Sequence, residues 1–203
     1  YEGLLPDGVR WVRYWDLADT EPSDKNPEPD WTVGALVGLH RGEDGDTLYI
    51  KDMVRAQLQG ATKRAWIEGV AGEDGVEVTQ AVEQEPGATG KEVARDYVVR
   101  LFRGLHAVVD RPSGSKVVRA SRWLPLAERG RVVLVRDGAR VPEWWEGFRG
   151  RLEQFPHGKR DEIDAVSGAY SVLMSRHNIP DMYDDEPPVR EPEPPKRRIP
   201  SMF

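Results

Sequence analysis

The order of the apolar repeats constrains the fold more than any other feature of the sequence. Residues 10–18 (RWVRYWDLA), 31–39 (WTVGALVGL) and 47–54 (TLYIKDMV) are rich in aromatic and β-branched side chains, which is typical of strands. Residues 41–46 (RGEDGD) separate the last two of these segments and have the composition of a hairpin turn. We therefore expect three consecutive antiparallel strands, with residues 19–30 as a polar loop after the first.

Beyond residue 60 the apolar spacing becomes helical, and helix and strand patterns then alternate. Helices are predicted at residues 62–71, 91–105, 116–129, 142–155 and 160–176, and strands at 77–83, 106–110 and 131–135. Pro86 ends the strand before it, because proline has no backbone N–H to donate to a sheet, and Pro125 disturbs the third helix for the same reason. This order predicts an α/β fold in which helices cover both faces of a mixed central sheet.

The length and composition of the chain indicate one domain with a tail. A chain of 203 residues suits a single core, since domains commonly contain roughly 100 to 200 residues. We assign the domain to residues 1–176, and residues 177–203 to a disordered, acidic and proline-rich tail that cannot bury enough apolar surface to fold. No apolar run approaches the roughly 20 residues needed to cross a bilayer, and no signal segment is visible, so we expect a cytoplasmic protein. The start at Tyr1 instead of Met suggests a piece of something larger.

Charge is distributed unevenly along the sequence. The net charge is −6, yet residues 1–50 hold 4 Lys and Arg against 11 Asp and Glu, whereas residues 86–160 hold 16 against 8. A basic stretch attracts the phosphate backbone of nucleic acid, and an acidic stretch can hold a divalent metal beside it. Ordinary surface variation is an equally good explanation until particular residues are considered. Because the chain has no cysteine, carboxylate and histidine are the remaining metal ligands.

Acidic residues stand at the ends of several predicted elements, and they are Asp16, the pair Glu83 and Glu85, and the pair Asp161 and Asp164. Asp16 and Glu83 each close a strand, so neighbouring strands would bring both carboxylates into one crevice at the edge of the sheet. The last helix could supply a third. Carboxylates in such a cluster repel one another unless a cation neutralises them, and hard oxygen ligands suit Mg²⁺ or Mn²⁺. Two such ions roughly 3.5 to 4 Å apart could activate a water for phosphodiester cleavage.

Each of these residues also has a purely structural interpretation. Asp16 could start a turn at the end of its strand. Glu83 and Glu85 are two residues apart, so they could form the solvated face of an edge strand. Asp161, at the start of a helix, could interact with the helix dipole, and Asp164 lies one turn further along the same face. None of these sites is decisive when taken alone.

The order and spacing of three segments resemble one family, the C-terminal nuclease domain of phage large terminases. The segments are residues 14–18 (YWDLA) with 30–38 (DWTVGALVG), 82–91 (VEQEPGATGK) and 158–167 (GKRDEIDAVS), and the match extends over about residues 13–173. The resemblance implies the RNase H-like fold, and it assigns the family's catalytic metal ligands to Asp16, Glu83 and Asp161. Glu85 is a close second choice to Glu83, and Asp164 matches a recurrent acidic position that binds metal or orients its neighbour.

The same resemblance implies a function in viral genome packaging. Large terminases join a packaging ATPase to a nuclease that cuts concatemeric double-stranded DNA when packaging starts and when the head is filled. The chain would use Mg²⁺ or Mn²⁺, act in the host cytoplasm, and work with its ATPase domain, the small terminase subunit and the portal or procapsid. Residues 87–91 (GATGK) depart from an ATPase phosphate loop, because Glu92 follows where Ser or Thr is needed, so we expect the ATPase half to be absent from this chain.

A basic segment at residues 110–122 (DRPSGSKVVRASR) also resembles the family. Its candidate phosphate contacts are Lys116, Arg119 and Arg122, and Lys91 and Lys159 are further candidates elsewhere in the sequence. For the first three, an ordinary solvated helix is the structural alternative.

Two other functions fit the same residues. Another RNase H-like nuclease, such as a Holliday-junction resolvase, would use the same carboxylates on branched DNA. A non-catalytic DNA-clamping or docking module of the packaging motor would keep the fold around a vestigial site. A glycosidase with paired carboxylates fits less well, because the basic middle block and the three segments point to DNA.

Overall fold

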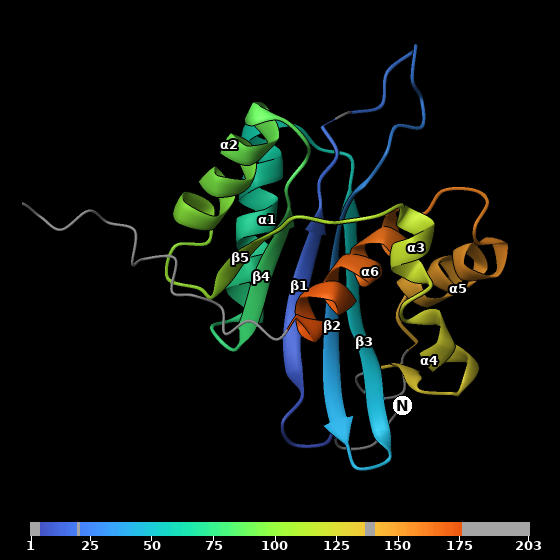
Figure 1. Cartoon of the computed structure of the whole chain (residues 1–203). Coiled ribbons are helices and arrows are strands. Elements are labelled where there is room, and N and C mark those ends of the chain that lie inside the picture. The colour runs from blue at the N-terminus through green and yellow to red at the C-terminus, as the bar shows by residue number, and fades with distance from the viewer. Residues whose placement is uncertain (1–4, 20, 137–140, 176–203) are drawn as a thin grey trace, which may run out of the picture.

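One mixed sheet forms the centre of the molecule (Figure 1). The computed structural model describes residues 5–19, 21–136 and 141–175, and six strands of this part of the chain form the sheet. The strands are β1 (Arg10–Asp16), β2 (Thr32–Gly42), β3 (Gly45–Ala56), β4 (Val78–Glu83), β5 (Ala107–Asp110) and β6 (Val132–Leu134). Their spatial order is β5-β4-β1-β2-β3-β6.

The chain first builds an antiparallel meander and then extends it with parallel strands on both sides. β1 pairs with β2, and β2 with β3, in antiparallel ladders, so the predicted group of three antiparallel strands is confirmed. β4 crosses over to lie parallel to β1, and β5 lies parallel to β4. β6 joins the other edge, parallel to β3. Because β1, β4 and β5 run in the same direction, their carboxyl ends reach the same edge of the sheet, where ligands of such sheets commonly bind.

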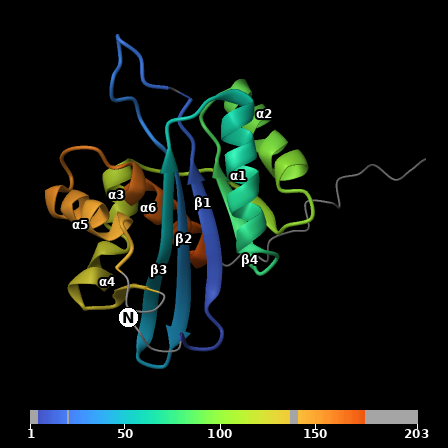
Figure 2. The ribbon, with the colours of Figure 1, turned by 180° about the vertical axis from the view of Figure 1, so that it is seen from behind.

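Helices cover both faces of the sheet, as predicted (Figure 1 and Figure 2). One face carries α1 (Gly60–Asp74), α2 (Ala88–Asp96) and the π-helical turn η1 (Tyr97–Leu101). The other face carries α3 (Lys116–Ala120), α4 (Leu124–Glu128), α5 (Trp144–Gln154) and α6 (Asp161–Met174). Side chains alternate between the two faces along β1, so Tyr14 packs in the core under α6, whereas Trp15 packs in the core under α1.

The helix predicted at residues 116–129 is interrupted. α3 ends at Ala120, and α4 begins at Leu124 with Pro125 in its first turn. A proline in the first turn costs no helical hydrogen bond, because the first N–H groups of a helix have no intrahelical acceptor. Pro125 therefore starts a second short helix instead of merely disturbing the first.

The helix predicted at residues 91–105 begins earlier and changes its winding. It starts at Ala88, and after Asp96 it continues as η1, where the N–H of Phe102 donates to the carbonyl of Tyr97 at 2.9 Å. This wider turn places both Tyr97 and Phe102 in the apolar core on the α1 side of the sheet.

Two further expectations concern the ends of the chain and the membrane. The predicted tail, residues 177–203, lies outside the described residues, and so the division between domain and tail stays a prediction. None of the helices in the described part of the chain is long and apolar enough to cross a membrane.

Helix α6 lies directly on β1 and β2, and a glycine sets how closely it approaches. A Cβ atom added to Gly168 would lie 2.1 Å from Cζ of Tyr14, far inside the van der Waals distance. The Tyr14 side chain is fully buried at this contact. The aromatic ring thus fills the space that a side chain at position 168 would need, so the positions of the helix and of the ring depend on each other.

We expect Gly168→Ala to destabilise the fold, because the added methyl group must push α6 away from the Tyr14 ring. Overpacking of this kind costs about 1 to 3 kcal/mol, which urea denaturation followed by circular dichroism would measure. Gly69→Ala in α1 is the matched control, because a Cβ at Gly69 meets no atom within 4 Å. The control is expected to gain up to about 1 kcal/mol from helix propensity. Equal stability of the two variants would contradict the tight packing of α6 on Tyr14.

Candidate active site

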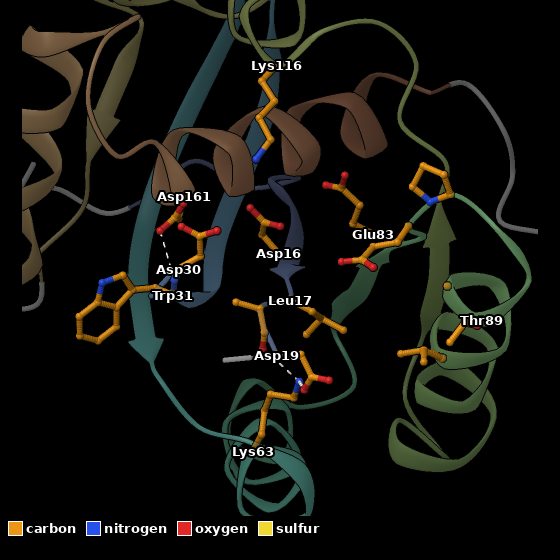
Figure 3. Close-up of a pocket in the computed structure, with 15 residues that line it drawn as sticks. Asp16, Leu17, Asp19, Asp30, Trp31, Lys63, Glu83, Thr89, Lys116 and Asp161 are labelled. Atoms are coloured by element: carbon orange, nitrogen blue, oxygen red, sulfur yellow. Dashed lines mark hydrogen bonds and ion pairs between the residues drawn. The ribbon is translucent and has the colours of Figure 1, made fainter. Parts of the chain in front are cut away.

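Carboxylates from three elements line one pocket at the edge of the sheet (Figure 3). Asp16 is the last residue of β1, Glu83 is the last residue of β4, and Asp161 is the first residue of α6. Because β1 and β4 are parallel neighbours, their final carboxylates lie at the same edge of the sheet. The pocket has a volume of about 610 Å³ and is also lined by Glu85 and Lys116. The structure therefore brings together the acidic sites that stood far apart in the sequence.

The carboxyl group of Asp16 is the most electrostatically perturbed acid of the pocket. Burial is the main cause that raises the pKa of Asp16 from 3.8 to about 7, and the charges of Glu83, Asp164 and Asp161 act in the same direction. The positive charge of Lys116 opposes them. Asp16 consequently becomes fully ionised at neutral pH only where additional positive charge is supplied.

Lys116 extends from α3 toward Asp16, in the middle of the acidic residues (Figure 3). Its Nζ lies 2.7 Å from Oδ2 of Asp164, whose side chain is only 1% exposed. Burial alone would lower the pKa of Lys116, but the contact with Asp164 and the charges of Asp16 and Glu83 raise it above the usual value. The ammonium group is therefore a constant positive charge inside the site. Lys116 lines the pocket, and its contact with phosphate stays a prediction.

The structure distinguishes two glutamates that the sequence left as alternatives. Glu83 closes β4, and its Oε2 accepts hydrogen bonds from Tyr14 at 3.3 Å and from Arg119 at 3.2 Å. Glu85 lies beyond the strand, and its side chain is exposed. Its backbone packs closely against Gly90, where an added Cβ atom would lie 2.3 Å from the carbonyl oxygen of Glu85. Both glutamates line the pocket, but Glu83 is the one whose side chain is hydrogen-bonded to described residues.

Two residues beside Glu83 were missed by the sequence analysis. The hydroxyl of Tyr14 donates a hydrogen bond to Oδ2 of Asp110 at 2.7 Å, and Asp110 is the ladder partner of Glu83. Burial, followed by the charges of Asp110 and Glu83, raises the pKa of Tyr14 far above its usual value, so the hydroxyl keeps its proton. A signal for Asp110 existed, because the strand predicted at residues 106–110 also ends in a carboxylate. No pattern in the sequence marked Tyr14, which reads as one more apolar strand residue.

Asp161 is held from the opposite side of the pocket, next to β2. The backbone N–H of Trp31 donates to its Oδ2 at 3.2 Å. Burial raises the pKa of Asp161 and the charge of Asp30 adds to the effect, whereas the bond from Trp31 and the charge of Lys116 lower it. Asp30 is exposed and stands beside Asp161 (Figure 3), so it is a further pocket carboxylate that the sequence analysis did not single out.

The predicted phosphate contacts lie in different environments. Lys91 and Arg122 are exposed and stay candidates. Lys159 donates to two backbone carbonyls of the loop before β2, at 3.0 and 3.4 Å, and so ties that loop to the start of α6. Arg119 is only 4% exposed, and its guanidinium group is hydrogen-bonded to Glu83. Arg119 is therefore bound to a carboxylate inside the protein, and its contact with phosphate stays a prediction.

The chemical type of the donor atoms in the pocket, carboxylate oxygen, suits a hard divalent cation. In the part of the chain that the structure describes, no three acidic or histidine side chains lie close enough to hold one ion together. The acids would have to move toward one another. The carboxylate oxygens are nevertheless the ligands that Mg²⁺ and Mn²⁺ prefer, and Oδ1 of Asp164 accepts no hydrogen bond from a described residue, whereas its Oδ2 is paired with Lys116. The excess of negative charge around Asp16 is what a bound cation would relieve.

Comparisons with known proteins identify the type of domain. Residues 13–173 match a family model described as the terminase RNase H-like domain. Among solved structures, the nuclease domain of the phage P22 large terminase is similar, with a TM-score of 0.56, 14% identity and 85% of each chain covered. A Mn-soaked, inhibitor-bound nuclease domain of the human cytomegalovirus terminase gives a TM-score of 0.56 and 13% identity over 84% of this chain and 85% of that one. The large terminase nuclease of the thermophilic phage G20c gives a TM-score of 0.52 and 16% identity over 84% of this chain and 85% of that one. No curated protein matches the sequence.

At such low identities the solved structures establish the fold alone. The RNase H-like fold that the sequence resemblance implied is confirmed, since the family model and the structural neighbours agree on it.

The raised pKa of Asp16 predicts that the fold loses stability as the pH rises. The folded protein holds this proton up to about pH 7, whereas an unfolded Asp releases it near pH 4, so the folded state binds more protons between these values. The stabilisation is complete below about pH 4 and is lost as the pH rises through about 7. Asp16→Asn should remove the part of this dependence that Asp16 contributes, being more stable than the parent by roughly 1 to 3 kcal/mol near pH 8 and about equal to it near pH 4.

Urea denaturation of both proteins in EDTA at the two pH values would measure this difference. Asp44→Asn, in the exposed turn between β2 and β3, is the control and should stay within about 0.5 kcal/mol of the parent at both pH values. An Asp16→Asn effect of the same size at both pH values would contradict the raised pKa.

Proposed function

Because the chain belongs to the terminase RNase H-like domain family, we propose that it is the metal-dependent endonuclease domain of a viral DNA-packaging terminase. Its substrate would be concatemeric double-stranded DNA, cut by phosphodiester hydrolysis when packaging begins and when it ends. Its partners would be the ATPase domain of the same terminase, the small subunit and the portal or procapsid, in the host cytoplasm.

One observation carries the proposal, namely the meeting of Asp16, Glu83 and Asp161 at a single pocket. A carboxylate that only started a turn or interacted with a helix dipole would need no acidic neighbours. Placing it among other carboxylates costs free energy, because like charges repel. The burial of Asp16 increases that cost, as its raised pKa shows. A fold that maintains such an arrangement has a use for a cation at this place.

Asp16, Glu83 and Asp161 are the residues that would hold Mg²⁺ or Mn²⁺, with Glu85 and Asp164 close by. Bound cations of this kind supply an activated water and stabilise the charge on the leaving oxygen. The solved cytomegalovirus domain was soaked with Mn, which supports a divalent ion for this chain. Asp164 does not line the pocket and is paired with Lys116, which favours an orienting role for it.

Basic residues would bind the DNA backbone around this pocket. The ammonium group of Lys116 lies in the pocket, where it can offset the charge of a phosphate, and Lys91 and Arg122 expose their charges outside it. Contacts of this type hold the duplex without reading its sequence, and they weaken as salt increases. This is consistent with an endonuclease that has little sequence preference of its own.

Asp16→Asn should abolish cleavage while keeping the fold, because the amide keeps the shape of the carboxylate but is a poor ligand for a hard cation. Loss of a direct ligand is expected to reduce the nicking rate of supercoiled plasmid in Mn²⁺ by at least about 100-fold, since changes in the surroundings of metal ligands already cost 10- to 100-fold. Asp44→Asn serves as the folded, active control. If Asp16→Asn nicked plasmid as fast as the parent, the nuclease assignment would be wrong.

Substrate choice and metal binding separate this proposal from its alternatives. Strong preference of the parent for four-way junctions over linear duplex would indicate a resolvase. If the chain bound DNA but calorimetry detected no Mn²⁺ binding, it would be a non-catalytic DNA-clamping or docking module.

Glu83→Gln and Glu85→Gln form a matched pair that decides the second ligand. The hydrogen bonds to Glu83 hold its carboxylate at the pocket, whereas Glu85 is exposed, so we expect Glu83→Gln to lose at least about 100-fold in nicking rate and Glu85→Gln less than about tenfold. The measurement is the initial rate of plasmid nicking at several Mn²⁺ concentrations. The reverse order of effects would assign the ligand to Glu85.

A further inference from the structure

Two acidic side chains stand next to each other where β4 and β5 end. Glu83 and Asp110 are direct partners in the parallel ladder, so their side chains leave the sheet on the same face. Like charges in this arrangement repel and destabilise a sheet unless other groups compensate. The pair therefore needs a proton donor or a cation beside it.

Tyr14 and Arg119 meet that need from two other elements. The Tyr14 hydroxyl lies 2.7 Å from Oδ2 of Asp110 and 3.3 Å from Oε2 of Glu83, so its single proton is shared between the two carboxylates and lies closer to Asp110. Arg119, from α3, donates through one of its terminal nitrogens to the same Oε2 at 3.2 Å. Asp110 thus fixes the direction of the hydroxyl, and the guanidinium group supplies the positive charge.

Neither of these two groups is free to move. The Tyr14 ring is fully buried against Gly168 of α6, and Arg119 is only 4% exposed. Both contacts to Glu83 fall on one oxygen, Oε2. Among the described residues no hydrogen bond reaches the other oxygen, Oε1, although Glu83 lines the pocket. The carboxylate is therefore fixed through one oxygen and available through the other.

We propose that Tyr14, Asp110 and Arg119 form a clamp that positions Glu83 for metal binding. The clamp holds Oε2 and leaves Oε1 to bind the ion. This inference rests on the proposed metal-dependent nuclease function, and it makes all three residues positioning residues that act through Glu83. It also gives Arg119 a function inside the protein instead of on the DNA.

The test is a titration of the full chain with Mn²⁺ by calorimetry, together with the Mn²⁺ dependence of plasmid nicking. Tyr14→Phe keeps the ring and removes the hydroxyl, so the Kd for Mn²⁺ and the Mn²⁺ concentration at half-maximal rate should both rise about 10- to 100-fold. The rate at saturating Mn²⁺ should stay near that of the parent. A merely structural defect would lower the maximal rate and leave the midpoint unchanged.

Tyr170→Phe is the matched control for the loss of a buried phenol. Tyr170 is on α6 and is 8% exposed, but it does not line the pocket, so its variant should keep the parental midpoint. Arg119→Lys and Arg119→Gln add a test that does not depend on Tyr14. The lysine keeps the positive charge and should stay within about threefold of the parental Kd, whereas the glutamine should weaken Mn²⁺ binding about tenfold or more.

Combination with Glu83→Gln shows whether the clamp acts through this glutamate. If it does, Tyr14→Phe should cause no further loss of Mn²⁺ affinity once Glu83 has been replaced. A parental Mn²⁺ affinity in both Tyr14→Phe and Arg119→Gln, with a loss in Glu83→Gln, would overturn the clamp and leave the nuclease proposal intact. A parent chain that neither binds Mn²⁺ nor nicks DNA would overturn the nuclease proposal, and the clamp with it.

Discussion

The contact between Gly168 and the Tyr14 ring determines the depth at which α6 lies on the sheet, and the site follows from that depth. α6 begins with Asp161 above the carboxyl end of β1, so its close approach brings this carboxylate toward Asp16. The parallel pairing of β1 with β4 adds Glu83 from the side. An ordinary side chain at position 168 would hold the helix further from the sheet and would move Asp161 away from Asp16.

The charges of the site are balanced by side chains from one short helix. α3 places Lys116 beside Asp164 and Arg119 beside Glu83, three residues apart and therefore on one face of the helix. These two cations do not neutralise the whole acidic group, as the raised pKa of Asp16 shows. The remaining negative charge is concentrated in the pocket where the last residues of β1 and β4 meet the start of α6. A cation from solvent would enter the site there.

The elements of the fold could be read from the sequence, because apolar periodicity depends on local geometry. The three strands, the later helices and the positions of Asp16, Glu83 and Asp161 at the ends of elements are all local features. The contacts that distinguish Glu83 from Glu85 are not local, since they come from Tyr14 on β1 and from Arg119 on α3. Arg119 was predicted to contact DNA from the resemblance of its basic segment, because a sequence shows that an arginine is charged but not that its side chain is buried against the carboxylate of Glu83.

The five-residue length of α3 has a consequence for how this domain can vary among relatives. Removal of one residue between Lys116 and Arg119 would leave them two positions apart, about 200° around an α-helix of about 3.6 residues per turn, and so on opposite faces. One of the two carboxylates would then lose its cation. Exposed Val117 and Val118, between these charges, can change in identity without that effect. Divergent sequences are therefore expected to conserve the spacing within this helix more strictly than the residues that fill it.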